Sequence, residues 1–359
     1  MTKLLLITSD FSPWRGGVAR YYSAFVQQLP EVSVVTSVPG EARARVWRRN
    51  WNWWLWPRWL PLVWQALRWK REFGAELVAA GQLLPIGTAL WLLKLITASD
   101  YAVFVHGLDV ALTSRSAWKR WLARRVLGSA HLVVANSEFT KSRAQAAGAV
   151  GERTVVIYPA AQGAPAAPEA VAELAGRHHL EGKQIVLTVA RLVKRKGIGT
   201  VLSVLPQLQA QFPGLVYVVV GDGPERARLE QLATSSTVPV LFAGAVSEAE
   251  LAAWYSLATV FVLTPEPDPV DVEGFGIVYL EAEGAGKPVI GSRVGGVPEA
   301  VGDGGMVVST PEELAAACRT LLGDPNLRQA LGAKGKARVA QGFTVAAQAA
   351  KLKQYLYAE

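Results

Sequence analysis

The sequence predicts an α/β protein with two doubly wound parallel-sheet domains of similar size. A length of 359 residues suits two domains at roughly 150 residues each. Short apolar runs alternate with stretches of helical period along the whole chain, which is typical of parallel α/β layers. A segment of small residues and prolines at 159–168 interrupts this pattern and is interpreted as a linker.

The first domain is expected to cover residues 1–160. Short runs of β-branched and other apolar residues predict strands at 4–7, 32–36, 101–105 and 132–135. Amphipathic stretches predict helices at 17–29, 86–96, 116–127 and 138–147. The uncharged stretch 77–93 contains Gly81 and Pro85 and is shorter than the ~20 apolar residues of a membrane span, so it is interpreted as a strand followed by a helix.

The second domain, expected at residues 170–340, repeats the scheme. Strands are predicted at 185–190, 216–220, 240–242, 260–263, 289–290 and 306–308, and helices at 198–211, 224–234, 247–257, 276–286, 311–322 and 326–340. Residues 341–359 are expected to form a C-terminal helix, for which packing against the first domain is one option. Folds of this class bind ligands at the carboxyl ends of their strands, so the two domains are expected to face a cleft.

Composition excludes several classes of protein. The single cysteine, Cys318, excludes a disulfide framework and a cysteine-based zinc cluster, and it fits a reducing compartment. The first residues resemble a buried strand rather than a cleaved signal peptide, because Ser9 and Asp10 follow the apolar run at once. A cytoplasmic protein is therefore expected.

Charge and tryptophan are distributed unequally between the halves. Residues 1–160 hold 20 Lys and Arg against 9 Asp and Glu, a net charge of +11, whereas the rest of the chain has a net charge of −3. Twelve of the 13 tryptophans also lie before residue 160. This asymmetry predicts that the first half meets an anionic partner, either a membrane or a nucleic acid.

The most specific motif is the block 271–290, followed by Gly295-Gly-Val-Pro-Glu299. Seven residues separate Glu273 from Glu281, and a Gly-Phe-Gly turn at 274–276 opens a predicted helix. Unpaired N–H groups at a helix start can hold a diphosphate. Because eight residues of helix span ~12 Å, the two carboxylates are expected to grip opposite ends of an elongated ligand rather than share one metal.

Two further loops follow predicted strands. Arg191 and Lys196-Gly197 come directly after the strand at 185–190, where two cations could neutralise a diphosphate. Gly221 lies in a Gly-Asp-Gly-Pro turn after the strand at 216–220. A basic loop alone is usually just solvated, and a glycine turn alone is common. The two loops therefore indicate a binding site only in combination with the Glu273 block.

These blocks, in this order and spacing, resemble the retaining glycosyltransferases of family four. The Glu-seven-residues-Glu hallmark of that family is matched by Glu273 and Glu281, and its upstream Arg and Lys-Gly pair by Arg191 and Lys196. Asp10 to Arg20 is similar to the glycine loop of the family, and His106 stands where the family keeps an active-site histidine. The block 271–281 resembles that of the phosphatidylinositol mannosyltransferases within this family. The resemblance covers residues 5–345 and implies a twin-Rossmann, or GT-B, fold.

The resemblance also implies a role for each matched residue. Catalytic roles fall to His106, Arg191, Lys196 and Glu273; the donor would be held by Gly16, Gly17, Gly221, Phe275, Gly276, Ile277 and Glu281. Glu273 would bind the sugar hydroxyls and Glu281 the ribose hydroxyls. The cations, with backbone N–H groups of 275–277, would hold the diphosphate. For His106, a satisfied buried histidine is the alternative.

The implied reaction is hexosyl transfer with retention of configuration, with mannose from GDP-mannose favoured by the resemblance alone. Preorganised positive charge would stabilise the departing diphosphate, and the leaving phosphate would take the acceptor proton. No cofactor is expected. A divalent metal is not required, because the sequence contains no Asp-x-Asp and separates Asp268 from Asp271 by two residues.

A basic, tryptophan-rich segment covers residues 43–71, with eight tryptophans among eight Lys or Arg. Indoles favour the headgroup level of a bilayer and cations an anionic leaflet. The segment is therefore interpreted as an interfacial anchor that also meets the acceptor, represented by Trp53, Trp54, Trp56 and Arg58. The alternative is that several of these indoles fill the core of the first domain. A nucleic-acid partner is not expected beside a sugar-transfer motif.

Three functions follow from these motifs. The favoured one is a hexosyltransferase at the inner face of the cell membrane, acting on a lipid or lipid-linked acceptor with a nucleotide-sugar donor. The second is a soluble nucleotide-sugar enzyme of the same fold, such as an epimerase or a transferase to a small sugar phosphate. The third, a non-catalytic binding relative, conflicts with the presence of Arg191, Lys196, Glu273 and Glu281 together.

Overall fold

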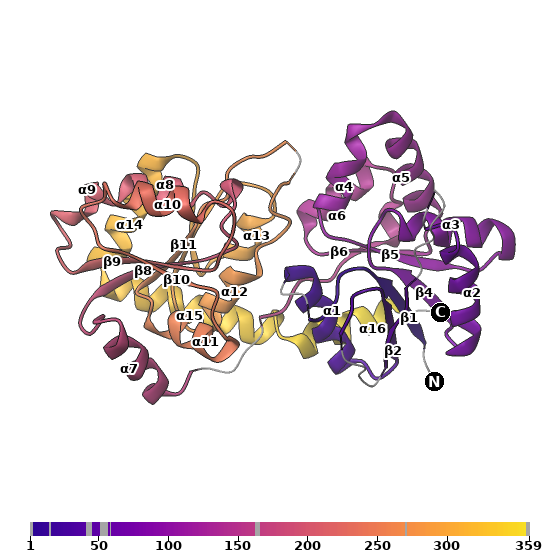
Figure 1. The fold of residues 1–359 in the computed structure, drawn as a ribbon, viewed down its shortest axis with the longest axis horizontal. Coiled ribbons are helices and arrows are strands. Elements are labelled where there is room, and N and C mark those ends of the chain that lie inside the picture. The colour runs from indigo at the N-terminus through magenta and orange to yellow at the C-terminus, as the bar shows by residue number, and fades with distance from the viewer. Residues whose placement is uncertain are drawn as a thin grey trace. The chain divides into compact units, whose positions relative to one another are not determined.

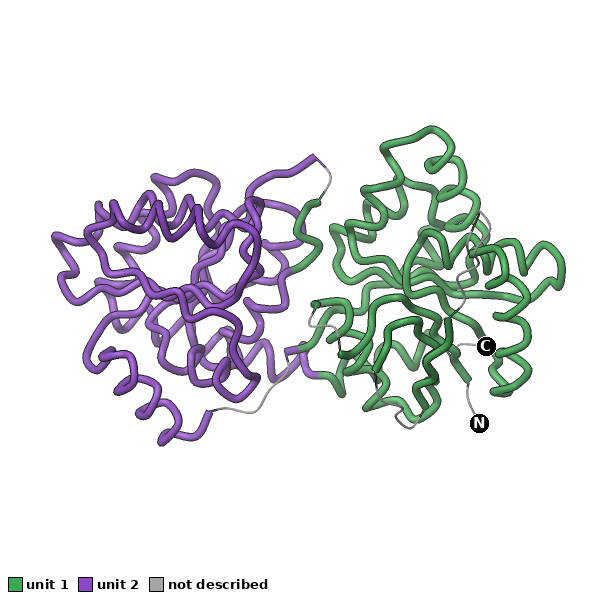
Figure 2. The backbone as a smooth tube through the Cα atoms, viewed as in Figure 1, with its two compact units in different colours: residues 1–160, 270–275, 345–359 green, residues 161–269, 276–344 purple. Residues whose placement is uncertain are grey.

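The computed structural model describes residues 3–13, 16–40, 45–50, 57, 59–161, 166–269 and 271–356. The chain divides into two compact units, coloured separately in Figure 2. Unit 1 comprises residues 1–160, 270–275 and 345–359, and unit 2 comprises 161–269 and 276–344. Each unit contains its own parallel sheet (Figure 1).

Unit 1 contains a seven-stranded sheet in the order β3-β2-β1-β4-β5-β6-β7, and all neighbouring strands are parallel. Its strands are β1 (Leu4–Thr8), β2 (Val32–Thr36), β3 (Val46–Arg48), β4 (Leu77–Ala80), β5 (Tyr101–Val105), β6 (Leu132–Ala135) and β7 (Thr154–Val156). Its α-helices are α1 (Gly17–Gln28), α2 (Leu62–Glu72), α3 (Ile86–Thr97), α4 (Leu108–Ala111), α5 (Ala117–Ser129), α6 (Glu138–Ala146) and α16 (Val345–Leu356), and short 3-10 turns occur at Leu112–Arg115 and Gly151–Arg153.

Helices cover both faces of this sheet. On one face, apolar side chains of α2, α3 and α5 form a continuous core with alternate residues of the strands, among them Ala66, Leu90 and Val126. On the other face, Phe25 of α1 and Leu352 of α16 enter a second core. Strands buried on both faces have to be apolar throughout, which explains why β1, β2 and β5 are fully buried runs.

Unit 2 contains a six-stranded parallel sheet in the order β10-β9-β8-β11-β12-β13. Its strands are β8 (Gln184–Val189), β9 (Leu215–Val220), β10 (Val240–Gly244), β11 (Val260–Leu263), β12 (Val289–Ser292) and β13 (Gly305–Val308). Its α-helices are α7 (Pro168–Arg177), α8 (Ile198–Val204), α9 (Pro206–Gln209), α10 (Arg226–Ala233), α11 (Glu248–Leu257), α12 (Ile277–Gly284), α13 (Val297–Val301), α14 (Pro311–Gly323) and α15 (Pro325–Gly342), with a 3-10 turn at Lys194–Lys196. One core lies under α8, α9, α10 and α14.

The structure confirms the predicted fold class of two doubly wound parallel sheets. The uncharged stretch 77–93 forms β4 and most of α3, as predicted. The sequence patterns did not predict β3 and β7, which have only three residues each, or the helices α2, α4, α7 and α13. The helix expected at 198–211 is divided at Pro206, because proline cannot donate the hydrogen bond that continues a helix. No described helix is both long and apolar enough to cross a membrane.

One interpretation of the Glu273 block is wrong. Glu273 and Glu281 were expected along one helix, but α12 begins only at Ile277, and Glu273 lies in the preceding loop. The residue before the helix, Gly276, has a φ of 99°, a left-handed conformation that ends any helix arriving from the N-terminal side. The separation of the two carboxylates is therefore not the rise of a helix.

A buried ion pair fixes α12 to its neighbours. Arg338 of α15 donates to Glu283 Oε2 at 2.6 Å, and the Glu283 side chain is fully buried. The same guanidinium also donates to the carbonyl oxygens of Glu299 and Ala300 in α13. Helices α12, α13 and α15 are thus joined through one side chain. Even beside this cation, burial raises the pKa of the Glu283 carboxyl to about 7.

Replacing Glu283 by Gln is expected to change how stability depends on pH. Between about pH 4.5 and 7 the folded protein retains the Glu283 proton that the unfolded chain has released, so this group lowers stability as pH rises. Glu283→Gln lacks this titration. The free energy of unfolding of the variant, relative to the original chain, should therefore rise by up to about 3 kcal/mol between pH 5 and 8. Urea denaturation across that range measures it, and parallel pH profiles would refute the pKa shift.

Candidate functional site

In unit 2, the loops that follow β8, β9 and β11 meet at the carboxyl edge of the sheet. The backbone N–H of Leu192 donates to the carbonyl oxygen of Asp222 at 2.9 Å, which joins the first two loops. The N–H of Glu266 donates to the carbonyl oxygen of Arg195 at 2.8 Å, which joins the first and third. Gly221 lies at this junction and donates to Gly244 at 2.8 Å.

The basic loop of unit 2 presents its cations at this edge. Arg191 is exposed and Lys196 is half-buried. Gly197, which follows, has a φ of 68°, and a Cβ there would lie 1.8 Å from the carbonyl oxygen of Thr264. Only glycine allows this approach, so the loop that carries both cations is held against the residue that follows β11. This arrangement suits the binding of an anion with more than one charged group.

Glu281 lies on α12 and is held by a residue that the sequence analysis missed. Tyr255 of α11 donates its hydroxyl to Glu281 Oε2 at 2.7 Å, and both side chains are buried. A hydrogen bond to a buried carboxylate is strong, because little water competes for it. Tyr255 lies 26 residues earlier in the chain, in a helix whose sequence resembles ordinary core, so no local pattern marked it.

In unit 1, His106 follows β5 and is bound by Tyr22 of α1. The Tyr22 hydroxyl lies 2.6 Å from His106 Nε2 and donates to the carbonyl oxygen of Gly81 at 2.6 Å. Since a tyrosine has one hydroxyl proton, this geometry favours an imidazole that donates from Nε2 and accepts at Nδ1. Burial lowers the pKa of His106 to about 3, so the ring is neutral near pH 7.

Asp109 organises the backbone around His106. Its carboxylate accepts from the N–H groups of His106 and Val110, each at 3.0 Å, and from Leu83 at 3.4 Å. The side chain therefore joins the loop after β5 to the loop after β4. Burial raises the pKa of Asp109, while these backbone donors act in the opposite direction. Asp109 follows His106 by three residues in the sequence, but no role was expected for it.

A second polar cluster lies at the ends of β1 and β4. Gln82 donates to Asp10 Oδ2 at 2.9 Å and to the Thr8 hydroxyl at 3.0 Å, and it accepts from the N–H of Ser9 at 3.2 Å. The adjacent carboxyl ends of β1, β4 and β5 thus carry Asp10, Gln82 and His106. Convergence of polar side chains at one edge of a parallel sheet is typical of a ligand site.

Glu273 belongs to the segment 270–275 that is part of unit 1, and this segment approaches His106. A Cβ on Gly274 would lie 2.5 Å from the carbonyl oxygen of His106, so only glycine fits there. Phe275 is buried, and its ring lies 5.4 Å from that of Tyr158. The structure therefore brings His106 and Glu273 to the same part of unit 1, whereas Arg191, Lys196, Gly221 and Glu281 belong to unit 2.

The remaining predicted donor-binding residues are at helix starts. Gly16 and Gly17 open α1, and a Cβ at either position would meet no atom within 4 Å. Neither position needs glycine for packing, and Gly16 has a φ of −110° that other residues also adopt. Gly276 and Ile277 open α12.

The predicted anchor is only partly described. Trp53, Trp54, Trp56 and Arg58 lie outside the described residues, so their role stays a prediction. Elsewhere in 43–71 the indoles are divided between core and surface. Trp69 is buried in the core, whereas Trp64 is 61% exposed. Trp47 packs on Phe73 with ring centroids 4.1 Å apart, and Trp59 also packs against the core.

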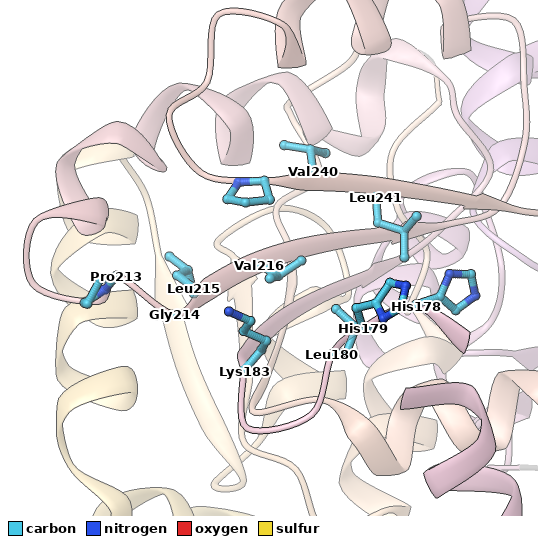
Figure 3. A pocket seen from close by; sticks show the side chains of 11 residues that line it. His178, His179, Leu180, Lys183, Pro213, Gly214, Leu215, Val216, Val240 and Leu241 are labelled. Atoms are coloured by element: carbon cyan, nitrogen blue, oxygen red, sulfur yellow. The ribbon is translucent and has the colours of Figure 1, made fainter. Parts of the chain in front are cut away.

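A hollow of about 250 Å³ in unit 2 lies at the opposite edge of the sheet (Figure 3). It is lined by the residues just before β8, β9 and β10 and by the first residues of β9 and β10, including His178, Lys183 and Val240. These are the amino ends of the strands, so the hollow is separate from the loops that carry Arg191 and Gly221. Across the described ranges, no group of three or more His, Cys, Asp or Glu could hold a metal ion. The expectation that no divalent metal is required stays a prediction.

Comparison with known proteins identifies both halves of the chain. The family described as "Glycosyltransferase Family 4" matches residues 15–161, and "Glycosyl transferases group 1" matches residues 173–338. The GDP-mannose-dependent alpha-(1-6)-phosphatidylinositol monomannoside mannosyltransferase of Mycobacterium tuberculosis is 32% identical over 99% of this chain and 98% of its own length. The corresponding enzyme for a monoacylated acceptor from Corynebacterium glutamicum is 30% identical over 94% of this chain and 93% of its own.

Solved structures share the fold. Anabaena HepE in complex with UDP superposes with a TM-score of 0.83 at 22% identity, covering 99% of this chain and all of that one. Sucrose-phosphate synthase from Thermosynechococcus elongatus superposes with a TM-score of 0.80 at 24% identity, covering 99% of this chain and 98% of its own.

Asp109→Ala is expected to destabilise the chain by about 1–3 kcal/mol, because buried N–H groups at His106 and Val110 lose their acceptor. Asp109→Asn should cost less, since the amide oxygen can still accept from both groups. Urea denaturation compares the variants with Asp324→Ala, which removes the single hydrogen bond of an exposed helix cap. If Asp109→Ala were no worse than that control, Asp109 would not organise the turn.

Proposed function

The chain belongs to the glycosyltransferases of family 4, and we propose that it transfers mannose from GDP-mannose to a phosphatidylinositol-based lipid, with retention of configuration. The observation that carries the proposal is identity of 30–32% over nearly the full length with mannosyltransferases named for this donor and this class of acceptor. The chain is a hexosyltransferase by family. The finer statements about sugar, acceptor, stereochemistry and a location at the inner face of the membrane are the proposal.

In the proposed reaction, the bond between the anomeric carbon and the diphosphate breaks while the acceptor hydroxyl forms its bond on the same face of the sugar. The departing phosphate oxygen takes the proton of that hydroxyl, so that no protein nucleophile is needed. The diphosphate gains charge in the transition state. Arg191 and Lys196, both in the loop after β8, are the residues proposed to stabilise this charge.

The other groups are proposed to orient the donor. Glu281, held by Tyr255 through Oε2, would accept from the ribose hydroxyls. His106, neutral and with Nδ1 as an acceptor, would accept from a sugar hydroxyl rather than donate a proton. Glu273 would bind the sugar from the segment beside His106. Gly16 and Gly17, which have open space around them, would let phosphate or acceptor approach the start of α1.

The direct test supplies GDP-mannose with phosphatidylinositol monomannoside in detergent micelles and follows transfer of mannose to the lipid. A parallel reaction offers a water-soluble sugar phosphate, which the alternative soluble enzyme would use. Thermal shifts with GDP, UDP and ADP identify the base, because a ligand at one hundred times its Kd stabilises the fold by about 2.7 kcal/mol. Transfer from UDP-sugars alone, or to soluble acceptors alone, would overturn the proposal.

Arg191→Ala and Lys196→Ala are each expected to lower kcat by orders of magnitude while the fold stays intact. The physical reason is that these cations interact more strongly with the diphosphate as its charge grows than with the bound donor. Steady-state kinetics with GDP-mannose give the split between kcat and KM. Lys194→Ala is the matched control, because Lys194 is an exposed cation in the same loop, on the turn that contains Lys196. Equal kcat with a raised KM would indicate uniform binding instead.

Glu281→Ala and Tyr255→Phe are both expected to weaken binding of free GDP, whereas Glu273→Ala should mainly lower turnover. The bond from Tyr255 to Glu281 is already made in the free protein, so its loss acts on GDP only through the orientation of Glu281, and Tyr255→Phe should raise the Kd for GDP less than Glu281→Ala does. Calorimetric titration measures this Kd. Tyr217→Phe is the control, because it removes another buried hydroxyl, one that donates to Thr188 at 2.9 Å. A control that weakens GDP binding equally would reduce Tyr255 to a structural role.

A further inference from the structure

The outward side of α3 is apolar over two turns. Trp91 and Leu95 are four residues apart and therefore lie on one face of the helix, next to Leu92 and Ile96. Leu95 is 65% exposed and Ile96 is 57% exposed. The helix contains no Asp or Glu, and its only charged residue, Lys94, pairs with Asp100. Solvent-facing helix surfaces are normally polar, so an apolar one indicates an interaction surface.

Helix α5 adds two exposed indoles to the same surface. Trp118 is 63% exposed and Trp121 is 43% exposed. Their rings are stacked, with centroids 5.0 Å apart and planes at 20°. Trp121 also meets Trp91 of α3 edge to face at 6.0 Å, so the two helices present one continuous patch. Neither exposed indole is needed to fill the core beneath, which consists of Leu122, Val126 and their neighbours.

Helix α5 also carries cations, of which Arg125 lies beside the indole pair. Arg120, Arg124 and Arg125 of α5 are exposed, and the helix contains no acidic residue. The Arg125 guanidinium lies 5.6 Å from the centre of the Trp121 ring. None of the three arginines forms an ion pair with the part of the chain that the structure describes. We call the set of Trp91, Leu95, Ile96, Trp118, Trp121 and these three arginines the α3–α5 face.

We propose that the α3–α5 face is the surface by which the protein lies on an anionic lipid bilayer. Indoles and short apolar side chains suit the headgroup level of a membrane, while arginines around them suit anionic lipids. A second copy of the chain is a poor occupant, because pairing this face with itself would bring six unpaired arginines together. This proposal rests on the proposed function in one respect, because access to a lipid acceptor is the reason it gives for membrane binding.

The chain connectivity places the indole pair of the face toward the sheet edge that carries His106. Helix α5 follows β5 after the short helix α4 and one 3-10 turn, so its first residues, including Trp118, are close in sequence to the carboxyl end of β5. A helix that returns along a parallel sheet begins at the carboxyl edge of the strands. The exposed indole pair is therefore at the end of α5 nearer to the edge that carries His106, within unit 1. This suits an acceptor whose headgroup projects from the bilayer.

The test measures flotation of the full chain with vesicles of phosphatidylcholine and phosphatidylglycerol, and with pure phosphatidylcholine. Replacing Arg120, Arg124 and Arg125 by Gln should weaken binding to anionic vesicles about a hundredfold, at about fivefold for each cation near the surface. This loss should shrink when salt is raised from ~0.1 M to ~1 M, because the Debye length falls from ~10 Å to ~3 Å. Trp118→Ser with Trp121→Ser should abolish the binding that persists at high salt.

A matched control replaces Lys183, Lys334 and Lys336 of unit 2 by Gln. Replacing these exposed lysines changes the net charge by the same amount, and they are far in sequence from the face. Vesicle binding should therefore stay within about twofold of that of the original chain. Circular dichroism and GDP binding in solution show that each variant is folded. Since the replaced side chains are exposed, unfolding is not expected from either set.

The outcomes separate this proposal from the proposed function. It is overturned if the original chain does not bind anionic vesicles, if the control variant loses as much binding as the arginine variant, or if the tryptophan variant binds unchanged at high salt. The last result would assign the anchor to the segment 43–71. If mannose transfer to lipid fails but vesicle binding follows the α3–α5 face, the surface stands and the proposed acceptor is wrong.

Discussion

Every strand pairing in both sheets is parallel, and the arrangement of the candidate site depends on this constraint. Parallel neighbours require a crossover through a helix, so all strands of a sheet end at one edge. Side chains that are far apart in sequence, such as Asp10, Gln82 and His106, then become neighbours without any specific contact to direct them. The same rule gathers the loops after β8, β9 and β11 in unit 2.

Buried polar groups convert this coarse placement into defined geometry. Asp109 binds three backbone N–H groups around His106, Tyr22 fixes the imidazole, and Tyr255 fixes one oxygen of Glu281. In each case a hydrogen bond fixes the orientation of a side chain or loop that could otherwise turn. Little water competes inside the protein, so these bonds are strong when made and costly when lost. Glu283 shows the cost of burying a carboxylate, because burial raises its pKa even though the guanidinium of Arg338 lies beside it.

The two units differ in what they offer a ligand. Unit 2 presents Arg191, Lys196 and the start of α12, which suit a nucleoside diphosphate. Residues 1–160 hold 12 of the 13 tryptophans and a net charge of +11, whereas the rest of the chain has a net charge of −3. Of the described indoles of unit 1, Trp118 and Trp121 of α5 and Trp64 of α2 are exposed, and Trp91 of α3 is half-buried beside Trp121. Folding thus divides the tryptophans of the first half between the core, where Trp69 lies, and the surface, where Trp118 lies.

The sequence by itself determined the fold class and the identity of most candidate site residues. Alternating apolar runs specify parallel layers, and the spacing of Glu273, Glu281, Arg191 and Lys196 is a property of the chain alone. Only the tertiary structure decided what surrounds these residues. The contact between Tyr255 and Glu281 spans 26 residues and has no local period, and the α3–α5 face combines two helices separated by β5. Gly276 placed Glu273 in a loop, because a left-handed residue cannot continue a helix. Local patterns report which faces are apolar, whereas partners across a core are chosen by packing between distant segments.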